Sequence, residues 1–440
     1  MPLNKPETSP HTPQNPVTLK HPSWCKNAVM YQINTRQFTH EGTFTAVIAQ
    51  LPRLKELGVD IIYLMPINPI GLKNRKGTLG SPYAVRDYLA INPEFGSLAD
   101  FKALVEAIHE HGMYVIVDWV ANHSAWDNVL VEQHPEWYST DHQGEFHPTP
   151  WWDWDDIIDF DYTKVALREY MAQAMQYWVE EADIDGYRCD VAGMVPSDFW
   201  VTVRQSLEQI KPVLMLAEWE TRDMHYAGFD MTYAWTWNEV MHAICMGKGK
   251  IEKLFKYYSW HEKSYPREAI KMTFVSNHDK NAWDGTEFEQ FGDGLKAAII
   301  LSFVGDGMPL IYNGQEAGNT KRLAFFERDP IRWQAHELGD FYHKLIHLKK
   351  STTALANGQW GATMRHIANT CPRDVLSFIR ADENGGVLVV LNLSAHEREI
   401  QFIRPLQHST YTDFFSQKVF CYEDKEILHL SPWDYRVWVF

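Results

Sequence analysis

The sequence lacks several features that mark out large classes of protein. It contains no run of eighteen or more apolar residues, so we expect no membrane-spanning helix and no membrane partner. Its five cysteines are an odd number without a motif spacing, which argues against a disulfide framework and against a zinc site. The net charge is −16, from 41 basic and 57 acidic residues, and no basic stripe is present. We therefore expect no nucleic-acid partner.

The N-terminal segment also lacks the apolar stretch of a secretory signal. Residues 1–22 are instead rich in proline and polar residues, and we expect them to form a flexible tail. This favours a cytoplasmic protein, although a mature secreted chain whose signal had been removed would look the same. Nothing in the sequence indicates an oligomeric state.

Apolar residues make up 45% of the 440 residues, which is enough for a large core and suggests two or three domains. From residue 28 to about residue 350, short apolar runs alternate with amphipathic helical stretches. The runs cover residues 29–33, 60–65, 114–118, 186–190, 213–218, 229–233, 271–276 and 309–312. Eight such units predict an α/β fold, a (β/α)₈ barrel over residues 23–350. A doubly wound open sheet is the alternative, but it would rarely need eight units.

Two segments depart from this alternation. Residues 123–161 are rich in Trp, His, Pro and Asp and are long for a connection, so we expect a small insertion over the barrel mouth. Residues 355–440 contain alternating strands around a turn at 382–386, which predicts a separate antiparallel β domain. Tryptophans gather in the insertion, at positions 151, 152 and 154, where flat rings suit stacking on sugars.

Carboxylates follow three of the predicted strands. Asp190 ends the fourth strand, Glu218 ends the fifth, and Asp279 lies just past the seventh. Neighbouring strands are about 4.8 Å apart. Asp190 and Glu218 can therefore approach the separation of about 5–5.5 Å that a retaining glycosidase needs. A helix cap or surface ion pair is the common fate of one carboxylate, but three at strand ends indicate one site.

The neighbours of the first two carboxylates suggest how their roles divide. Arg188 lies two residues before Asp190 on the same side of the strand, where it would keep Asp190 ionised as a nucleophile. Glu218 has no adjacent cation in the sequence and lies between Ala217 and Trp219. Apolar surroundings raise the pKa of a carboxyl group, which suits a proton donor.

Two histidines stand beside these carboxylates. His123 follows Asn122, and His278 lies between Asn277 and Asp279. At a barrel mouth they would donate hydrogen bonds to sugar hydroxyls. A metal site is the weaker interpretation, because no His-x-x-x-His or two-His-one-carboxylate spacing appears.

At these residues the chain resembles the α-amylase family, glycoside hydrolase family 13, and its maltodextrin-active members of the neopullulanase and maltogenic-amylase kind. The family's signatures resemble residues 118–123, 158–161, 186–190, 218, 277–279 and 305–316. The resemblance spans most of residues 24–335. It implies a (β/α)₈ barrel with a short domain B after the third strand and a C-terminal antiparallel β-sandwich.

The resemblance also implies a role for each matching residue. Asp190 would be the nucleophile, Glu218 the general acid/base and Asp279 the carboxylate that stabilises the transition state. Nine further residues would bind the substrate: Tyr83, Asp118, His123, Arg188, Val191, Trp219, His278, Asp329 and Arg332. The match at Asp329 and Arg332 is loose, and Arg328 is an alternative to Arg332.

The chain departs from the family at positions that affect specificity. Typical starch-degrading members carry a Lys-His pair where this chain has Gly193 and Met194. Asn122 matches a calcium ligand of many members, but no arrangement resembles a dedicated oxygen cage. We therefore expect no required cofactor, with calcium as the alternative. Val191 is similar to members that accept α-1,6 as well as α-1,4 bonds.

The implied function is retaining hydrolysis of α-1,4, and in some relatives α-1,6, glucosidic bonds in maltooligosaccharides or other α-glucans. A transglycosylase or isomerase of the same fold, such as a trehalose synthase, is the second hypothesis. It would use Trp219, Trp235 and Trp237 as an apolar shelf for the acceptor sugar. A non-catalytic carbohydrate-binding or scaffold protein is the third, and the presence of all three carboxylates disfavours it.

Overall fold

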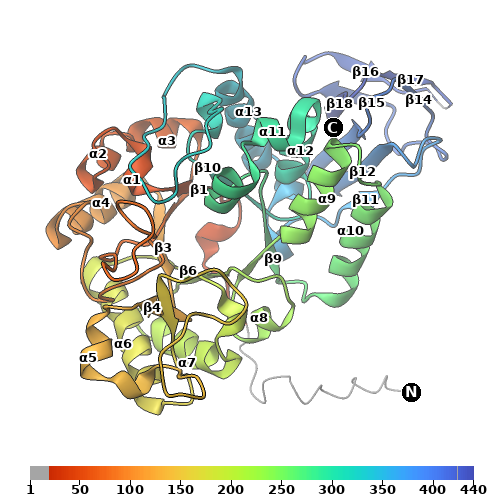
Figure 1. Ribbon diagram of the computed structural model, residues 1–440. Helices are drawn as coiled ribbons and strands as arrows, with labels where there is room; N and C mark the ends of the chain where they lie inside the picture. Colours follow the sequence, from red (N-terminus) through yellow and green to blue (C-terminus); the bar gives the residue numbers. More distant parts are fainter. Residues whose placement is uncertain (1–18, 424) are drawn as a thin grey trace, which may run out of the picture.

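The computed structural model describes residues 19–423 and 425–440, and eight parallel strands form a closed barrel at its centre (Figure 1). The strands are β1 (Met30–Ile33), β2 (Ile61–Leu64), β3 (Tyr114–Trp119), β6 (Gly186–Cys189), β7 (Leu214–Ala217), β8 (Met231–Tyr233), β9 (Ile270–Thr273) and β10 (Met308–Tyr312). Each predicted run contains or overlaps one of these strands, so the (β/α)₈ prediction is confirmed.

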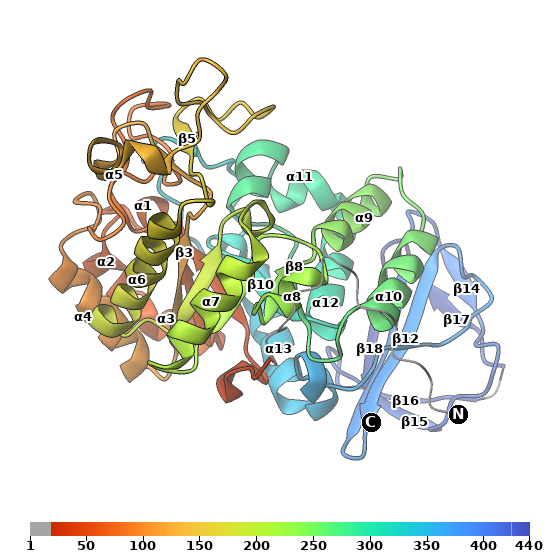
Figure 2. The ribbon, with the colours of Figure 1, turned by 90° about the horizontal axis from the view of Figure 1, so that it is seen from below.

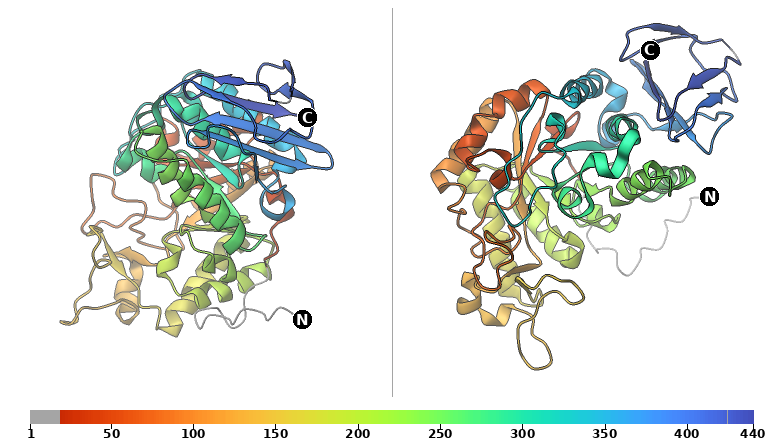
Figure 3. Two further views of the ribbon diagram at one scale, coloured as in Figure 1. Left: turned by 90° about the vertical axis from the view of Figure 1, so that its right-hand side faces the viewer. Right: turned by 45° about the horizontal axis from the view of Figure 1, so that its top comes forward.

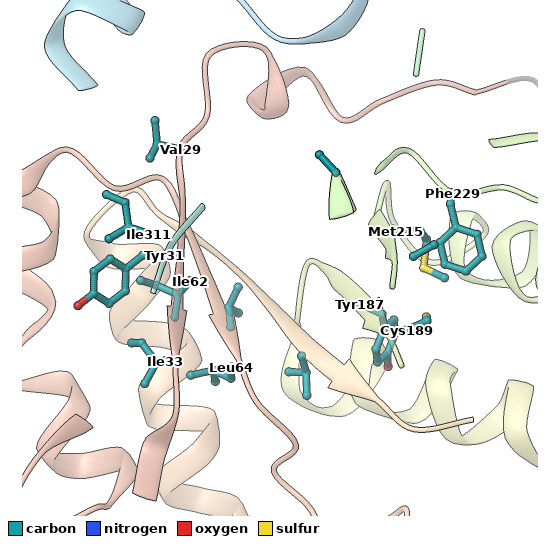
Figure 4. Packing of buried hydrophobic residues seen from close by; sticks show 14 of the residues in the cluster. Val29, Tyr31, Ile33, Ile62, Leu64, Tyr187, Cys189, Met215, Phe229 and Ile311 are labelled. Carbon is teal, nitrogen blue, oxygen red and sulfur yellow. The ribbon is translucent and has the colours of Figure 1, made fainter. Parts of the chain in front are cut away.

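The strands read as continuous apolar runs because both of their faces are buried. Alternate residues such as Met30, Ile61 and Ile116 fill the barrel interior. The residues between them, such as Tyr31 and Ile62, pack outward against the helices (Figure 4). This two-residue period also decides which polar side chains at the strand ends point inward.

Helices surround the barrel (Figures 1 and 2). They are α1 (Thr35–Phe38), α2 (Phe44–Ile48), α3 (Leu51–Leu57), α4 (Leu98–Glu110), α6 (Val165–Ala182), α7 (Ser197–Glu208), α8 (Asp223–Tyr226), α9 (Trp235–Cys245), α10 (Glu252–Ser264), α11 (Glu287–Phe291), α12 (Leu295–Val304) and α13 (Glu337–Ser351). Ser97 precedes helix α4 and forms a reciprocal capping box with Asp100. None of the described helices is long and apolar enough to cross a membrane.

The insertion after β3 contains regular structure, as a small inserted domain should. Strand β4 (His123–Ala125) pairs antiparallel with β5 (Ile157–Asp159), and α5 (Val129–Gln133) lies between them in the sequence. The pairing sets His123 opposite Asp159. The insertion therefore returns to the barrel mouth at the point where it left it, beside the end of β3.

The C-terminal domain is antiparallel and lies on one side of the barrel (Figure 3). Its larger sheet has the order β11 (Arg365–His366), β12 (Val375–Asp382), β13 (Gly385–Asn392), β18 (Tyr435–Val439), β15 (Thr410–Asp413) and β16 (Val419–Cys421). Strands β14 (Arg398–Ile400) and β17 (Leu428–Leu430) form a smaller sheet. Apolar residues of both sheets share one core, as in a β-sandwich.

The predicted tail is fixed where the structure describes it. His21 is buried, and its Nδ1 lies 2.7 Å from Asp230 Oδ1 while its Nε2 bonds the Glu268 carbonyl oxygen at 2.6 Å. A flexible tail over all of residues 1–22 is therefore wrong at its C-terminal end. Residues 1–18 lie outside the described part of the chain.

Candidate active site

The site is built around Arg188, which lies on β6 between two outward-facing residues, Tyr187 and Cys189. Its side chain points into the barrel and is fully buried. Arg188 Nη1 donates to Asp118 Oδ1 at 2.7 Å and to Asp190 Oδ1 at 2.8 Å. One guanidinium group thus joins the end of β3 to the carboxylate that follows β6.

Glu218 shares the same cation. Arg188 Nη2 lies 3.0 Å from Glu218 Oε2, so the expectation that Glu218 lacks a neighbouring cation is wrong. The reason is that β6 and β7 are adjacent, and Arg188 spans both strand ends. Asp190 and Glu218 are therefore two carboxyl groups held beside one guanidinium.

Burial is the largest influence on the pKa values of the three carboxyl groups predicted to be catalytic. It raises the pKa values of Asp190, Glu218 and Asp279, and the Arg188 charge opposes each rise. Because the groups are close enough to interact, their titration belongs to the cluster. Glu218 also has Asp190 and Asp279 as negative neighbours, and its pKa lies well above the usual range of a glutamate.

Val191 fixes the orientation of Glu218. Its backbone N–H donates to Glu218 Oε2 at 2.8 Å. To do so the chain takes a left-handed conformation at Val191, with φ of 35°, which is unusual for a β-branched residue. Backbone strain of this kind persists where the surrounding structure enforces it, commonly at functional sites.

These groups face a cavity of about 630 Å³ at the mouth of the barrel. Seven of the predicted residues line it: Tyr83, His123, Asp190, Val191, Glu218, His278 and Asp279. Arg188 and Asp118 lie beneath, in contact with this lining through Asp190 and Tyr83. The structure therefore brings together most of the residues predicted from the sequence.

Three inward-facing residues of the site were missed. Gln32 on β1, Tyr63 on β2 and Tyr233 on β8 each follow an apolar interior residue by two positions. Tyr63 donates to Asp118 Oδ2 at 2.7 Å, and the Tyr233 hydroxyl oxygen accepts from Arg188 Nε at 3.1 Å. The two-residue period of the strands was the signal that would have placed them.

The described insertion contacts the site through His123. His123 Nε2 lies 3.9 Å from Asp190 Oδ2, and burial lowers the pKa of His123 to about 4. Asn122 Nδ2 donates to His123 Nδ1 and to Asp159 Oδ1, each at 3.2 Å. The ring is therefore neutral near pH 7 and directs an N–H into the cavity.

The contacts of Asn122 also bear on whether calcium could bind beside it. The Asn122 amide nitrogen is turned toward Asp159, the one carboxylate beside it. Among residues 19–423 and 425–440, no group of three or more His, Cys, Asp or Glu side chains is arranged to hold a metal ion. The donor set around Asn122 does not fit a calcium cage, and we derive no catalytic step through a metal.

Two pairs of aromatic side chains line the cavity, and we call them the aromatic walls. Trp152 and Trp154 of the insertion stack with ring centroids 4.7 Å apart. Trp283 and Phe325, the second pair, lie 5.4 Å apart. Neither Trp283 nor Phe325 was predicted from the sequence, because Trp283 lies in a short π-helical turn (Lys280–Asp284) and Phe325 in a loop, and only the tertiary fold brings the two together.

Besides Arg188 and Asp118, three predicted binding residues lie outside the cavity lining. Asp329 pairs with Lys321 and accepts from the Ala324 backbone N–H at 2.9 Å, so it organises the loop that carries Phe325. Arg332 is exposed to solvent. Neither side chain is among the residues that line the cavity, and substrate binding by Asp329 and Arg332 stays a prediction.

The remaining residue outside the lining is Trp219. Its indole ring packs on the backbone of Gly193, beside the cavity. Trp237, the third member of the expected acceptor shelf, is fully buried and donates its Nε1–H to Tyr258 at 2.9 Å. Trp237 is therefore a core residue and cannot contact a substrate.

A parallel barrel whose strand ends bring two buried carboxyl groups together beside one arginine has the paired carboxyl groups that glycoside hydrolysis requires. The catalytic-domain model of the α-amylase family matches residues 28–351, and the C-terminal-domain model of maltogenic amylases matches residues 365–437. The chain belongs to the α-amylase family of glycosidases.

Known relatives are similar over most of the chain. A maltogenic alpha-amylase structure from Thermotoga neapolitana is 34% identical, with a TM-score of 0.85 over 95% of this chain and 100% of its own. A cyclomaltodextrinase from a Bacillus species is 27% identical over 86% of this chain and 75% of its own length. An alpha-amylase from Haloarcula japonica is 28% identical over 85% of this chain, which spans 56% of that relative.

Proposed function

We propose that this protein cleaves α-glucosidic bonds in maltooligosaccharides with retention, through a covalent glucosyl-enzyme intermediate. The observation that supports this most strongly is the sharing of Arg188 by Asp190 and Glu218, at 2.8 and 3.0 Å. Two carboxyl groups beside one guanidinium are close enough for one to attack and the other to protonate the same glycosidic bond.

Asp190 is the proposed nucleophile. Its Oδ1 accepts from Arg188, while Oδ2 lies on the His123 side, facing the cavity. The hydrogen bond from Arg188 favours the ionised form and fixes the direction of attack. Asp190 Oδ2 would bond to the anomeric carbon as the bond to the leaving oxygen breaks.

Glu218 is the proposed acid in this step. Its Oε2 is already occupied by the Val191 N–H and the Arg188 guanidinium, so the carboxyl proton resides on Oε1. Burial raises the pKa of Glu218, which favours the protonated form that a proton donor needs. Glu218 would donate it to the leaving oxygen, then remove a proton from the incoming water, which releases the sugar and restores Asp190.

The proposed substrate class is supported by the side chains that line the cavity and by the names of the relatives. The aromatic walls formed by Trp152, Trp154, Trp283 and Phe325 suit the flat faces of glucose rings. The names of the relatives, maltogenic alpha-amylase and cyclomaltodextrinase, favour short or cyclic maltodextrins over long starch chains. Asp279 would bind sugar hydroxyls and stabilise positive charge at the anomeric carbon.

Transfer to a sugar acceptor is the second candidate function, and one observation favours it. Trp219 follows the proposed acid directly and covers Gly193, so an apolar surface borders the leaving-group side of the site. An apolar surface there would hold a sugar acceptor against competing water. Maltotriose products longer than the starting sugar would identify this activity.

The Asp190→Asn variant tests the proposal. It removes the nucleophile with little change in shape, so we expect turnover to fall by about 10³-fold or more while folding is preserved. Near-normal turnover in a pure sample would contradict the mechanism.

Proton NMR of the first product should show the α-anomer, and initial release of the β-anomer would contradict retention. A product panel of maltotriose, pullulan, cyclodextrin, isomaltose and trehalose would define the linkage.

A further inference from the structure

Gln32 contacts His278 at two points across the barrel interior. Both residues are buried, with exposures of 0% and 2%. Gln32 Nε2 lies 2.7 Å from His278 Nδ1, and Gln32 Oε1 accepts from the His278 backbone N–H at 3.3 Å. A backbone N–H can only donate, so the amide oxygen of Gln32 must face it and the amide nitrogen must face the ring. His278 Nδ1 is therefore an acceptor, and the ring hydrogen is on Nε2.

The hydrogen bonds on the Nε2 side of the His278 ring lead independently to the same tautomer. Asp118 is paired with Arg188 at 2.7 Å and, as a carboxylate, can only accept. It accepts from Tyr63 at 2.7 Å and from Tyr83 at 2.8 Å. Because Tyr83 gives its hydrogen to Asp118, its oxygen must accept from His278 Nε2, which lies 2.8 Å away.

We propose that Gln32 is a positioning residue that holds His278 as the neutral Nε2–H tautomer, so that His278 serves the cavity only as a hydrogen-bond donor. This rests on the proposed function in taking a sugar hydroxyl as the acceptor during catalysis. A second hydrogen on Nδ1 would point at the amide N–H of Gln32 over 2.7 Å. Two donors cannot share that contact, so Gln32 disfavours the imidazolium form of His278.

The charges around His278 are consistent with a neutral ring. Burial and, to a smaller extent, the Arg188 charge lower its pKa to about 3, against the opposing effect of Asp118. Asp279 Oδ2 lies 3.3 Å from His278 Nε2, on the same side as the ring hydrogen. The Nε2–H therefore has the Tyr83 hydroxyl oxygen as its acceptor in the resting enzyme, and that contact can yield to a substrate hydroxyl.

Nitrogen-15 NMR of the histidine rings tests the tautomer directly in the resting wild-type protein. The chain has 20 histidines, and the His278 signals are identified by their loss in His278→Asn. We expect Nδ1 to have the shift of an unprotonated nitrogen and Nε2 that of a protonated one at neutral pH. An Nδ1–H tautomer or an imidazolium would overturn the proposal. Because no substrate is present, this result is separate from any failure of the proposed function.

Two substitutions of Gln32 extend the test. Gln32→Glu supplies a carboxylate that accepts from Nδ1–H, so the His278 ring should gain a hydrogen on Nδ1 and kcat should acquire a new pH dependence. Gln32→Met keeps a similar shape without either hydrogen bond, and we expect mixed tautomers without that new pH dependence. Ring shifts and pH profiles identical to those of the wild type in both variants would overturn the role of Gln32.

Discussion

The indole ring of Trp219 lies directly on Gly193. A Cβ atom added at Gly193 would be 2.1 Å from Trp219 Cε2, so no side chain fits there while the ring keeps its place. Gly193 lies three residues after Asp190, where typical starch-degrading relatives carry a lysine. Trp219 therefore leaves no room in this chain for the lysine that the family resemblance implies at this position.

The first prediction concerns this contact. Gly193→Ala should lower the free energy of unfolding by about 1–3 kcal/mol, because the added methyl group overpacks against the indole. Displacement of Trp219 should also change the ratio of transfer products to hydrolysis products from maltotriose. Urea denaturation and product analysis measure the two effects.

A control for Gly193→Ala exists in helix α13. An added Cβ atom at Gly339 would come no closer than 3.3 Å to its nearest neighbour, and alanine there improves helix propensity. Gly339→Ala should therefore cost much less stability than Gly193→Ala, because its added methyl group meets the Glu316 carbonyl oxygen at 3.3 Å rather than an indole ring at 2.1 Å. Equal destabilisation by the two variants would contradict the overpacking argument.

The aromatic walls lead to a second prediction. Trp152→Ala and Trp283→Ala should each raise KM for maltooligosaccharides by about 2- to 10-fold, as expected for the loss of one aromatic contact of about 0.5–1.5 kcal/mol. Trp151 is the matched control, since it is fully exposed and lies beside Trp152 without lining the cavity. An equal effect of Trp151→Ala would show that the walls are not specific binding surfaces.

The third prediction separates direct binding from loop organisation at Asp329. Asp329 pairs with Lys321, whose side chain is 53% exposed, so the pair is worth at most about 1 kcal/mol. Asp329→Ala and Lys321→Ala should reduce kcat/KM by a similar factor, and the double variant should lose little more. If Asp329 touched the substrate itself, Lys321→Ala would be nearly silent.

The fourth prediction concerns pH. Activity requires an ionised Asp190 and a protonated Glu218, so kcat/KM should follow a bell-shaped profile. Burial raises the pKa values of both groups, so the acidic limb should lie above the ordinary aspartate value of about 3.9. The basic limb should lie well above the ordinary glutamate value of about 4.3, and Glu218→Gln should remove it. An acidic limb below about pH 3.5 would contradict the role of burial.

The sequence predicted the barrel because eight apolar strands with two buried faces leave a strong signal. It predicted Asp190, Glu218 and Asp279 because three carboxylates at the ends of three strands of one barrel indicate one site. It did not predict the shared cation, since Arg188 and Glu218 lie on different strands and meet only after the barrel closes.

Loops were the least predictable part of the site. Trp283 and Phe325 reach the cavity through segments without a periodic pattern, and Asp329 resembled a binding residue although its partner is Lys321. Gln32 is different, because it follows Met30 on the inward face of β1 and could have been placed by the two-residue period. The sequence therefore carried more information about the side chains inside the barrel than about those on the loops at its mouth.

Identification of the nucleophile tests the account most directly. A fluorinated α-glucosyl fluoride, which forms the glycosyl-enzyme faster than it is hydrolysed, should add the mass of one fluorosugar to the protein. Peptide mapping should locate that mass on Asp190, and Asp190→Asn should remain unlabelled. A label on Glu218 or Asp279, or turnover without any label and with inversion of the anomeric centre, would contradict the account.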